Sequence, residues 1–337
     1  MLKRFRVEES SDKNDVIRVP VEAMRKATEA IFRVCGLTQS SASICTDVLI
    51  SNDLRGNDSH GVSNMLRKVR STFKCLSSLK TFLTYSFQYT EWYLGGNQNP
   101  KPYVKIVNGY SETSAVSIID GDGALGIHVG PMAMKLAIEK AKKFGMGCVI
   151  VKNAGHLGGA GYHASLAAKE GCIGQCFGAP GGGLICPTFG AEPRFGTHPM
   201  SWAAPGGANE ADFLFDVATS QVAANKLRLA ARLGVPIAEN WITDENGKVI
   251  ETEVDKIPDK FYMAPMGGTR ENSSHKGYGL ACVIDILCNT LSGIGAGFLT
   301  GGGGLLFQAY DIASFCDIKV QILFPFSAGN PFFKSPI

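Results

Sequence analysis

The chain has 337 residues, of which 45% are hydrophobic and 19% are charged, and this composition predicts an ordinary folded protein with room for two domains. Its formal net charge of +3 is too small to indicate nucleic acid binding. The 10 cysteines are scattered, and Cys172 and Cys176 lack the two-residue gap and histidine partners of a zinc site. We therefore expect reduced, buried thiols in a cytoplasmic protein without a bound metal.

Two segments are candidates for a secretory signal and for a membrane-spanning helix, and neither has the required pattern. Residues 1–9 are basic and then acidic without an apolar core, so they do not predict a secretory signal. Residues 280–299 approach membrane-spanning length, but Asp285, Asn289 and Ser292 interrupt them. A buried helix followed by a glycine-rich turn fits this segment better.

Residues 20–53 show helical spacing and predict two helices. The first opens at Val21 and Glu22, and Ser40 and Ser41 are the predicted caps of the second. Each helix should pack through one apolar stripe.

The second helix should break near residues 58–61, where Ser59 stands beside His60. A neutral histidine next to a hydroxyl can move protons near neutral pH, so this pair is a candidate for acid–base chemistry. A solvated loop pair is the alternative, and the decision depends on what the rest of the chain supplies.

From Ser114 onward the pattern alternates between strands and helices. This alternation predicts an α/β domain. The predicted strands cover residues 115–119, 148–151, 173–177, 201–204 and 213–216, and the predicted helices cover residues 131–144, 162–169 and 221–233.

Residues 121–126 match the G-x-G-x-x-G pattern between the first strand and the first helix of this domain. In a Rossmann fold the next strand should end in an acidic residue that holds the adenosine ribose. Here that strand runs into Lys152 and Asn153. We therefore favour a glycine-rich turn that serves backbone geometry, with dinucleotide binding as the alternative.

A second glycine-rich segment, residues 153–162, places His156 at the start of a predicted helix. Its glycines would let a flat ligand approach the backbone, and the helix start offers N–H groups to an anion. Tight packing in a strand-to-helix connection explains the same glycines equally well.

Two further segments place small polar side chains at predicted strand ends, where open α/β sheets bind ligands: residues 195–199 and residues 216–220. A third, residues 274–279, carries Lys276 on a predicted loop in front of a helix that begins at Leu280. A lysine there can bind a carboxylate, phosphate or ribose, or it can be a solvated residue at a helix start.

Taken together, these motifs resemble the malate/L-lactate dehydrogenase type 2 family, which also includes ureidoglycolate, sulfolactate and piperideine-2-carboxylate reductases. The resemblance runs from Pro20 to Asp317. It implies an NAD(P)-dependent oxidoreductase that transfers a hydride between nicotinamide and a 2-hydroxy or 2-oxo acid. It also implies a non-Rossmann α/β cofactor domain with a mixed sheet, a helical second domain built from N- and C-terminal segments, and a homodimer.

The same resemblance implies roles for individual residues. Ser59 and His60 would be the proton-transfer pair, and His156 would compete with His60 as the acid–base residue. NAD is the expected cofactor, with NADP left open because the sequence does not place Arg194 or Arg228 near the adenosine 2′ position. The implied cofactor contacts are Gly158, Gly159, Ala179, Asp216, Val217, Ala218 and Lys276, and the implied substrate contacts are Arg55, Arg67 and Thr197.

The resemblance predicts three segments. Residues 1–112 would form the helical part of the substrate and dimer domain, residues 113–299 the cofactor domain, and residues 300–337 a segment that returns to the first domain. Within the first, residues 69–88 are a predicted insertion, and the end of the third departs from the family pattern.

Two single positions also depart from that pattern. Asn64 stands where many members carry an arginine for the substrate carboxylate, and Arg67 is the nearest replacement. Lys226 stands where some members have an acidic residue. Two alternatives therefore remain open: a cyclic imine (C=N) reductase of the same family, and a catalytically impaired dinucleotide-binding protein.

Overall fold

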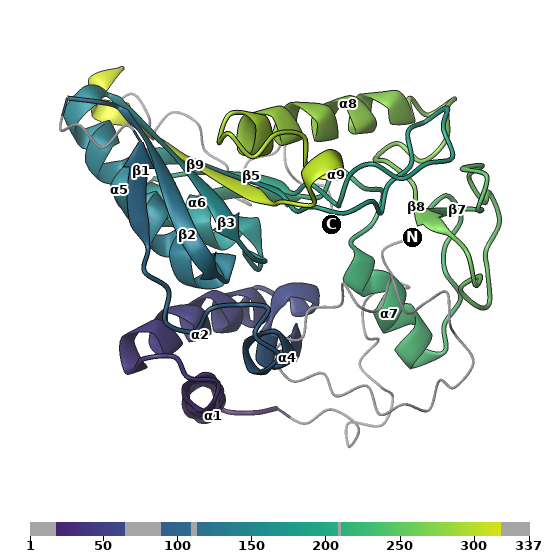
Figure 1. Ribbon diagram of the computed structural model, residues 1–337, viewed down its shortest axis with the longest axis horizontal. Helices are drawn as coiled ribbons and strands as arrows, with labels where there is room; N and C mark the ends of the chain where they lie inside the picture. Colours follow the sequence, from purple (N-terminus) through teal and green to yellow (C-terminus); the bar gives the residue numbers. More distant parts are fainter. Residues whose placement is uncertain (1–17, 65–88, 109–112, 208–209, 318–337) are drawn as a thin grey trace.

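The computed structural model describes residues 18–64, 89–108, 113–207 and 210–317. A seven-stranded mixed sheet dominates it, with the order β1-β2-β3-β9-β4-β5-β6 (Figure 1). β2 and β3 are parallel, and every other neighbouring pair is antiparallel. The predicted α/β class with a mixed sheet is therefore confirmed.

The strands of this sheet are β1 (Lys105–Asn108), β2 (Val116–Ala124), β3 (Met146–Ala154), β4 (Cys172–Ala179), β5 (Met200–Ala204), β6 (Phe213–Val217) and β9 (Gly304–Asp311), while β7 (Ile242–Thr243) and β8 (Tyr262–Met263) pair separately. The α-helices are α1 (Val21–Val34), α2 (Gln39–Leu54), α4 (Tyr89–Leu94), α5 (Gly126–Phe144), α6 (Ala160–Lys169), α7 (Ala224–Leu233), α8 (Ser274–Asp285) and α9 (Gly297–Thr300). Short helical turns are η2 (Asp58–His60), η3 (Val62–Asn64), η4 (Ile286–Thr290) and η5 (Ile312–Ser314).

Side chains on alternate positions of the strands fill two separate cores, one on each face of the sheet. On β3, Val149 packs with α5 and α6 on one face, and Ile150 packs with Ile284 of α8 on the other. This is the expected result of the two-residue period of a strand. Figure 1 shows α8 across the sheet from α6.

A layer formed by α1, α2 and α4 lies below the sheet and shares a third core with the start of α5 (Figure 1). The predicted two N-terminal helices are present, but Thr38 caps the second, because its hydroxyl accepts a hydrogen bond from the Ser41 N–H at 3.2 Å. The predicted caps, Ser40 and Ser41, lie inside α2.

The glycine-rich segment at residues 121–126 is used by the backbone itself. β2 continues through it to Ala124, and the first N–H groups of α5, from Gly126 and Ile127, donate to the carbonyls of Gly155 and His156, both at 3.1 Å. These bonds occupy donors that a dinucleotide phosphate would need. The geometric interpretation of this motif therefore fits better than the dinucleotide one.

Two other expectations differ from the structure. Residues 274–279 are not a loop, because α8 begins at Ser274, and Gly277 is required there since a Cβ would lie 2.2 Å from the Met266 carbonyl oxygen. The described part of residues 300–337 does not return to the helical layer, because β9 lies between β3 and β4. The predicted insertion at residues 69–88 and Arg67 lie outside the described residues.

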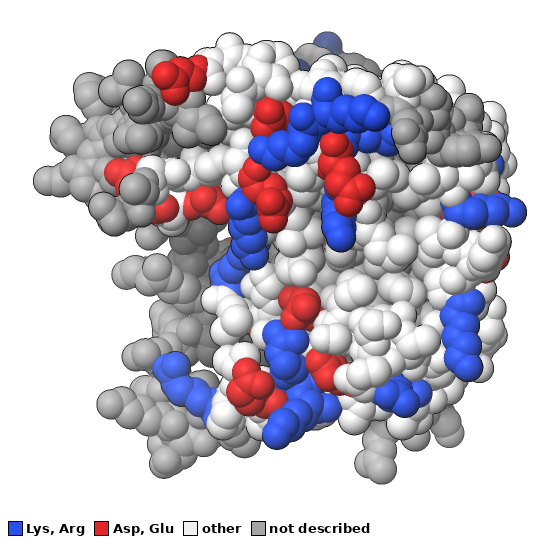
Figure 2. All heavy atoms as spheres, turned by 90° about the vertical axis from the view of Figure 1, so that its left-hand side faces the viewer, with Lys and Arg blue, Asp and Glu red and all other residues white. Residues whose placement is uncertain are grey.

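The surface carries ordinary mixed charge on the face that Figure 2 shows, with Lys and Arg among Asp and Glu. An ion pair joins Arg25 of α1 to Asp47 of α2. Among the described residues, no helix has the length and apolarity to cross a membrane. The segment at residues 280–299 is instead divided between α8, a π-helical turn and α9.

Candidate active site

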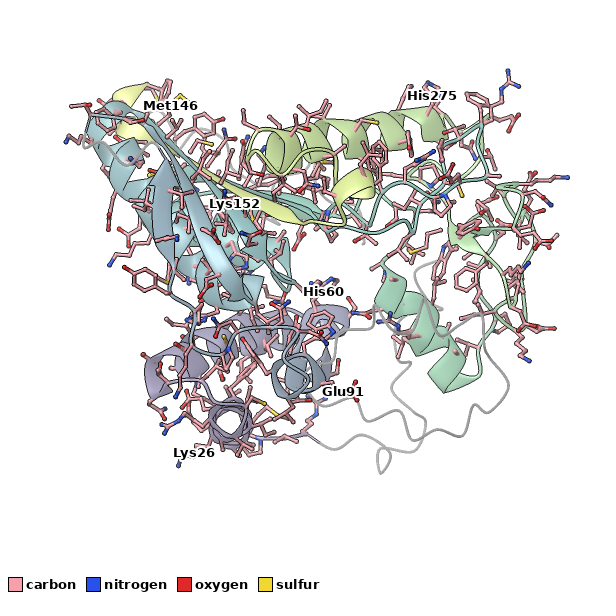
Figure 3. The ribbon with its side chains drawn as sticks, in the orientation of Figure 1. Lys26, His60, Glu91, Met146, Lys152 and His275 are labelled. Atoms are coloured by element: carbon pink, nitrogen blue, oxygen red, sulfur yellow. The ribbon has the colours of Figure 1, made fainter. Side chains whose placement is uncertain are left out.

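The structure brings the two predicted catalytic histidines together. The rings of His60 and His156 are stacked, with centroids 5.8 Å apart and planes inclined by 16°. His60 ends the η2 turn after α2, and His156 follows β3 in the connection to α6. Figure 3 shows His60 between the helical layer and α7.

Each histidine has a hydroxyl partner. His60 Nδ1 lies 2.8 Å from Ser59 Oγ, and the Ser59 hydroxyl donates to Asn57 Oδ1 at 3.0 Å. His156 Nδ1 lies 2.7 Å from the hydroxyl of Tyr89, the first residue of α4. The Ser59–His60 pair is therefore held in place and is not a solvated loop pair.

The second partner of His156 determines its tautomer. The backbone N–H of Gly158 donates to His156 Nδ1 at 3.1 Å. Since an amide N–H cannot accept, Nδ1 carries the lone pair and the ring proton of neutral His156 lies on Nε2. His156 can then donate a hydrogen bond from Nε2.

Both histidines are neutral at pH 7. Burial lowers the pKa of His60 from 6.5 to about 4. Burial, followed by the repulsion that a protonated His60 would exert and by the charge of Arg228, holds the pKa of His156 well below its ordinary value. Both side chains are partly exposed, and neutral imidazoles in such a position are suited to hydrogen bonding and proton transfer with a bound substrate.

Helix α7 adds two residues to this site that the sequence motifs did not indicate. Asn225 Nδ2 donates to the Ser59 carbonyl at 2.5 Å, and Arg228 Nη1 donates to Asn225 Oδ1 at 2.6 Å. Arg228 is only 9% exposed. The three-residue spacing places both side chains on one face of α7, so a buried cation lies behind the backbone of the Ser59–His60 pair.

The glycines of the connection after His156 serve the packing of the protein. Gly158 has a φ of 73°, which disfavours any side chain, and a Cβ on Gly159 would lie 2.1 Å from Asn52 Oδ1 of α2. These glycines thus let α2 lie against the start of α6. The packing interpretation of this segment accounts for both of them without a ligand.

Asp216 on β6 has a geometry that fits a dinucleotide. Its Oδ2 accepts a hydrogen bond from the Gly161 N–H at 2.7 Å, the residue is exposed, and its Oδ1 makes no hydrogen bond within the described part of the chain. An exposed carboxylate oxygen at a strand end can accept the ribose hydroxyls of NAD. Arg55 donates to Ser165 Oγ at 3.3 Å, and its charge lowers the pKa of Asp216 against the larger effect of burial, so it lies near this carboxylate.

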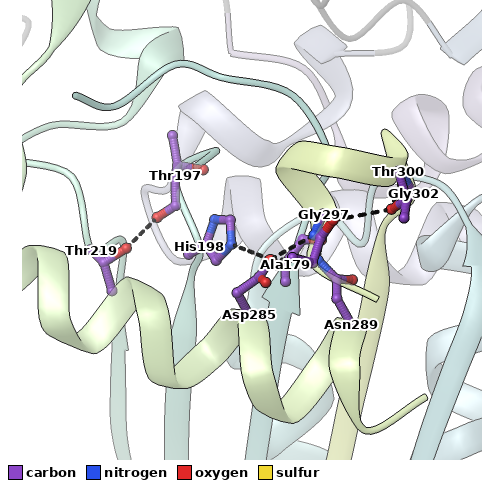
Figure 4. A network of polar contacts seen from close by, with 10 residues as sticks. Ala179, Thr197, His198, Thr219, Asp285, Asn289, Gly297, Thr300 and Gly302 are labelled. Atoms are coloured by element: carbon purple, nitrogen blue, oxygen red, sulfur yellow. Dashed lines mark hydrogen bonds and ion pairs between the residues drawn. The ribbon is translucent and has the colours of Figure 1, made fainter. Parts of the chain in front are cut away.

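Thr197 and Ala179 belong to a polar network on the α8 side of the sheet (Figure 4). The Thr197 carbonyl accepts hydrogen bonds from the N–H and hydroxyl of Thr219 at 2.9 and 3.1 Å. Asn289 Nδ2 donates to the Ala179 carbonyl at 3.3 Å and to Asp285 Oδ1 at 2.7 Å. Ala179 is fully buried, so it presents no atom to a ligand in this structure.

In the same network the Asp285 carboxylate faces His198 Nε2 at 3.5 Å. Burial alone would raise the pKa of Asp285, but hydrogen bonds from His198 and Asn289 outweigh it and lower that pKa. Asp285 is therefore an anion that ties α8 to the segment between Thr197 and β5.

Lys276 is not brought to the histidine pair. It is exposed in the first turn of α8, and its ammonium group makes no hydrogen bond or ion pair with the described residues, while its backbone N–H donates to the Ser273 carbonyl at 2.9 Å. Figure 3 places its neighbour His275 across the sheet from His60. Val217 and Ala218, which follow Asp216, are both partly exposed and close to the proposed ribose position in sequence.

Comparison with known proteins gives a consistent result. Residues 84–320 match the family model described as malate/L-lactate dehydrogenase. This interval starts after Ser59 and His60, so the match does not rest on them. The chain is 36% identical over 278 residues to malate dehydrogenase of Pyrococcus horikoshii, covering 82% of this chain and 69% of that protein. It is 34% identical over 266 residues to L-sulfolactate dehydrogenase of Methanocaldococcus jannaschii, covering 79% and 67%.

Solved structures agree with these sequence matches. The crystal structure of malate dehydrogenase from Entamoeba histolytica superposes with a TM-score of 0.76 and 31% identity, covering 91% of this chain and 82% of that one. Sulfolactate dehydrogenase of Methanocaldococcus jannaschii gives a TM-score of 0.73 and 30% identity over 91% and 81%. The similarity thus extends over the fold as well as the sequence.

Proposed function

Given that the chain belongs to the malate/L-lactate dehydrogenase family and is a hydroxyacid oxidoreductase, we propose that it transfers a hydride between NAD and a small 2-hydroxy or 2-oxo acid of the malate or lactate type. The observation that carries this proposal is the stacked, neutral pair of His60 and His156, each with a hydroxyl at its Nδ1. We place the reacting oxygen of the substrate against the Nε2 atoms of this pair.

The chemistry of carbonyl reduction needs both histidines. Negative charge develops on the carbonyl oxygen in the transition state, so a hydrogen bond from His156 Nε2 stabilises it and a proton must reach it. His60, oriented by Ser59, exchanges that proton. Such general acid–base catalysis is typically worth about 10²-fold or more in rate. This division assigns different roles to the two histidines that the sequence left in competition.

Asp216 supports NAD as the cofactor, because a carboxylate suits ribose hydroxyls and repels the 2′-phosphate of NADP. When bound, the nicotinamide supplies or accepts the hydride. The engagement of the α5 N–H groups by carbonyls supports a non-Rossmann cofactor domain, and the α1, α2 and α4 layer supports a separate helical domain. We also propose that Gly158, Gly159, Val217 and Ala218 contact the cofactor. The protein is proposed to be a cytoplasmic homodimer, in which Lys276 is a further cofactor contact.

We assign the substrate carboxylate to Arg228, together with Thr197. Arg228 is buried, its charge acts on His156, and Asn225 fixes its guanidinium relative to Ser59. A buried guanidinium is the preferred partner of a carboxylate. Arg228 would thus take the role of the arginine that many family members carry at the position of Asn64. Arg55 lies by Asp216 and is proposed for the cofactor side.

The test is oxidation of NADH and of NADPH by the purified protein with malate-, lactate-, sulfolactate- and imine-type oxidised substrates. We expect turnover with at least one 2-oxo acid and a preference for NADH. His60→Ala should reduce turnover at least about 10²-fold and leave NADH binding intact. Turnover on the cyclic imine alone, or NADH binding without turnover on any 2-oxo acid, would overturn the proposal.

A further inference from the structure

A chain of hydrogen bonds runs from His60 back into helix α2. His60 Nδ1 meets Ser59 Oγ at 2.8 Å, and Ser59 Oγ meets Asn57 Oδ1 at 3.0 Å. Asn57 Nδ2 meets Asn52 Oδ1 at 3.2 Å, and Asn52 Nδ2 meets the Val48 carbonyl at 2.8 Å. This series of hydrogen bonds ends at the backbone carbonyl of Val48, which can only accept a hydrogen bond.

The direction of every bond follows from that end. A carbonyl only accepts, so Asn52 must present its NH₂ group to Val48 and its oxygen to Asn57. Asn57 must then donate its NH₂ group to Asn52, which leaves its oxygen for Ser59. The single hydroxyl hydrogen of Ser59 goes to Asn57, so Ser59 Oγ accepts from His60 Nδ1–H. Neutral His60 therefore carries its proton on Nδ1 and a lone pair on Nε2.

Packing prevents this chain from reversing. Asn52 is 3% exposed, and its oxygen occupies the space in which a Cβ of residue 159 would stand, 2.1 Å away. The Asn57 backbone N–H also donates to the Asn52 carbonyl at 2.9 Å, which fixes the turn that carries the Asn57 side chain. An inverted Asn52 amide would face Val48 with oxygen against oxygen, at the cost of a buried, unmade hydrogen bond.

We propose that Asn57 and Asn52 are positioning residues that hold His60 in the Nδ1–H tautomer, so that His60 Nε2 is the proton acceptor of the enzyme. The proposal rests on the proposed function for its chemistry. The two stacked rings then differ: His156 presents an N–H at Nε2, and His60 presents a lone pair at Nε2. A substrate hydroxyl can accept from His156 and donate to His60 at the same time.

The proton and electron balance follows from this arrangement. In hydroxy acid oxidation the O–H bond of the substrate breaks and its proton goes to His60 Nε2. The C–H bond of the carbon that carries this hydroxyl breaks as well, its hydride goes to oxidised nicotinamide, and the C=O bond forms. In the reverse reaction His60 Nε2 must first take a proton from solvent. The resulting imidazolium still donates from Nδ1 to Ser59, so the chain to Val48 remains intact in both directions.

The first test reads the tautomer directly. Long-range ¹H–¹⁵N correlation spectra of protein labelled with ¹⁵N-histidine distinguish a protonated ring nitrogen from one with a lone pair, and His60→Gln assigns the His60 signals. We expect protonated Nδ1 and bare Nε2 in the wild type near neutral pH. Asn57→Ala and Asn52→Ala should give a mixture of tautomers. A His60 proton on Nε2 in the wild type would overturn the proposal.

The second test reads the reaction. Asn57→Ala should lower kcat of hydroxy acid oxidation about 10-fold, with NADH binding unchanged. Asn57→Asp should restore only part of the rate, because its carboxylate still accepts from Ser59 but loses the hydrogen bond to Asn52 Oδ1. Its charge should move the acid limb of the kcat/KM profile to higher pH. Asn246→Ala, in an exposed turn, is the matched control and should change neither measurement.

These two readouts separate the inference from the function on which it rests. The expected tautomer without turnover of any hydroxy acid would refute the proposed function and leave the hydrogen-bond chain standing. Turnover in the wild type with an unchanged rate and tautomer in Asn57→Ala would refute the positioning role and leave the function standing.

Discussion

The lowered pKa of His60 predicts that the two directions of the reaction respond oppositely to pH. With a pKa of about 4, only about one His60 in a thousand is protonated at pH 7. Reduction of the 2-oxo acid needs this protonated form, whereas oxidation needs the neutral form. The kcat/KM of reduction should therefore rise about tenfold for each unit of pH decrease from about pH 8 to about pH 5, and that of oxidation should stay level over this range.

Initial rates of NADH consumption and formation, followed by absorbance in buffers of constant ionic strength, measure both profiles. Short assays at low pH avoid acid decomposition of NADH. A His60 of ordinary pKa would make the reduction rate level off below about pH 6.5. Such a plateau would refute the conclusion that burial lowers the pKa of His60, because a rate that depends on protonated His60 levels off only below the pKa of His60.

Three further predictions concern stability and substrate binding. His163 is fully buried and donates to the Leu157 carbonyl, and burial lowers its pKa from 6.5 to about 4. Between these two pH values the unfolded state therefore binds more protons than the folded state. The free energy of unfolding should fall by about 3 kcal/mol as the pH drops through this range. Urea unfolding should show this slope flattened in His163→Gln. Gly159→Ala should destabilise the protein by about 1–3 kcal/mol in the same assay, because the new methyl would lie 2.1 Å from Asn52 Oδ1; unchanged stability would contradict the packing. Arg228→Gln should raise KM for the 2-oxo acid at least about 10-fold without changing NADH affinity, and Arg228→Lys should do so less; equal KM values in all three proteins would remove Arg228 from the substrate site.

The sheet and its flanking helices could be predicted from the sequence because their signals are local. The predicted strand at residues 173–177 lies within β4, and the predicted helix at residues 162–169 lies within α6. The predicted start of α8 at Leu280 was wrong for a different reason. Gly277 and its neighbours look like loop residues, but tertiary contact with Met266 requires a glycine inside the helix. Close packing of this kind leaves no local signal.

The site shows the same division. Ser59, His60 and His156 stand in recognisable motifs, and the structure brings the two histidines together. Tyr89 and Arg228 could not be predicted, because an ordinary aromatic at a helix start and an ordinary arginine on an amphipathic helix gain a role only from long-range contacts. The histidine tautomers likewise depend on bonds between segments and not on residue type.

The position of β9 has a consequence for the way the protein folds. β9 lies between β3 and β4, and it is the last strand in sequence among the described residues. Until it has been synthesised, β3 and β4 each lack one neighbour, and unpaired edges of apolar strands invite pairing between chains. Such long-range closure is slow, so the nascent chain should be open to aggregation late in synthesis and should benefit from chaperones at that stage.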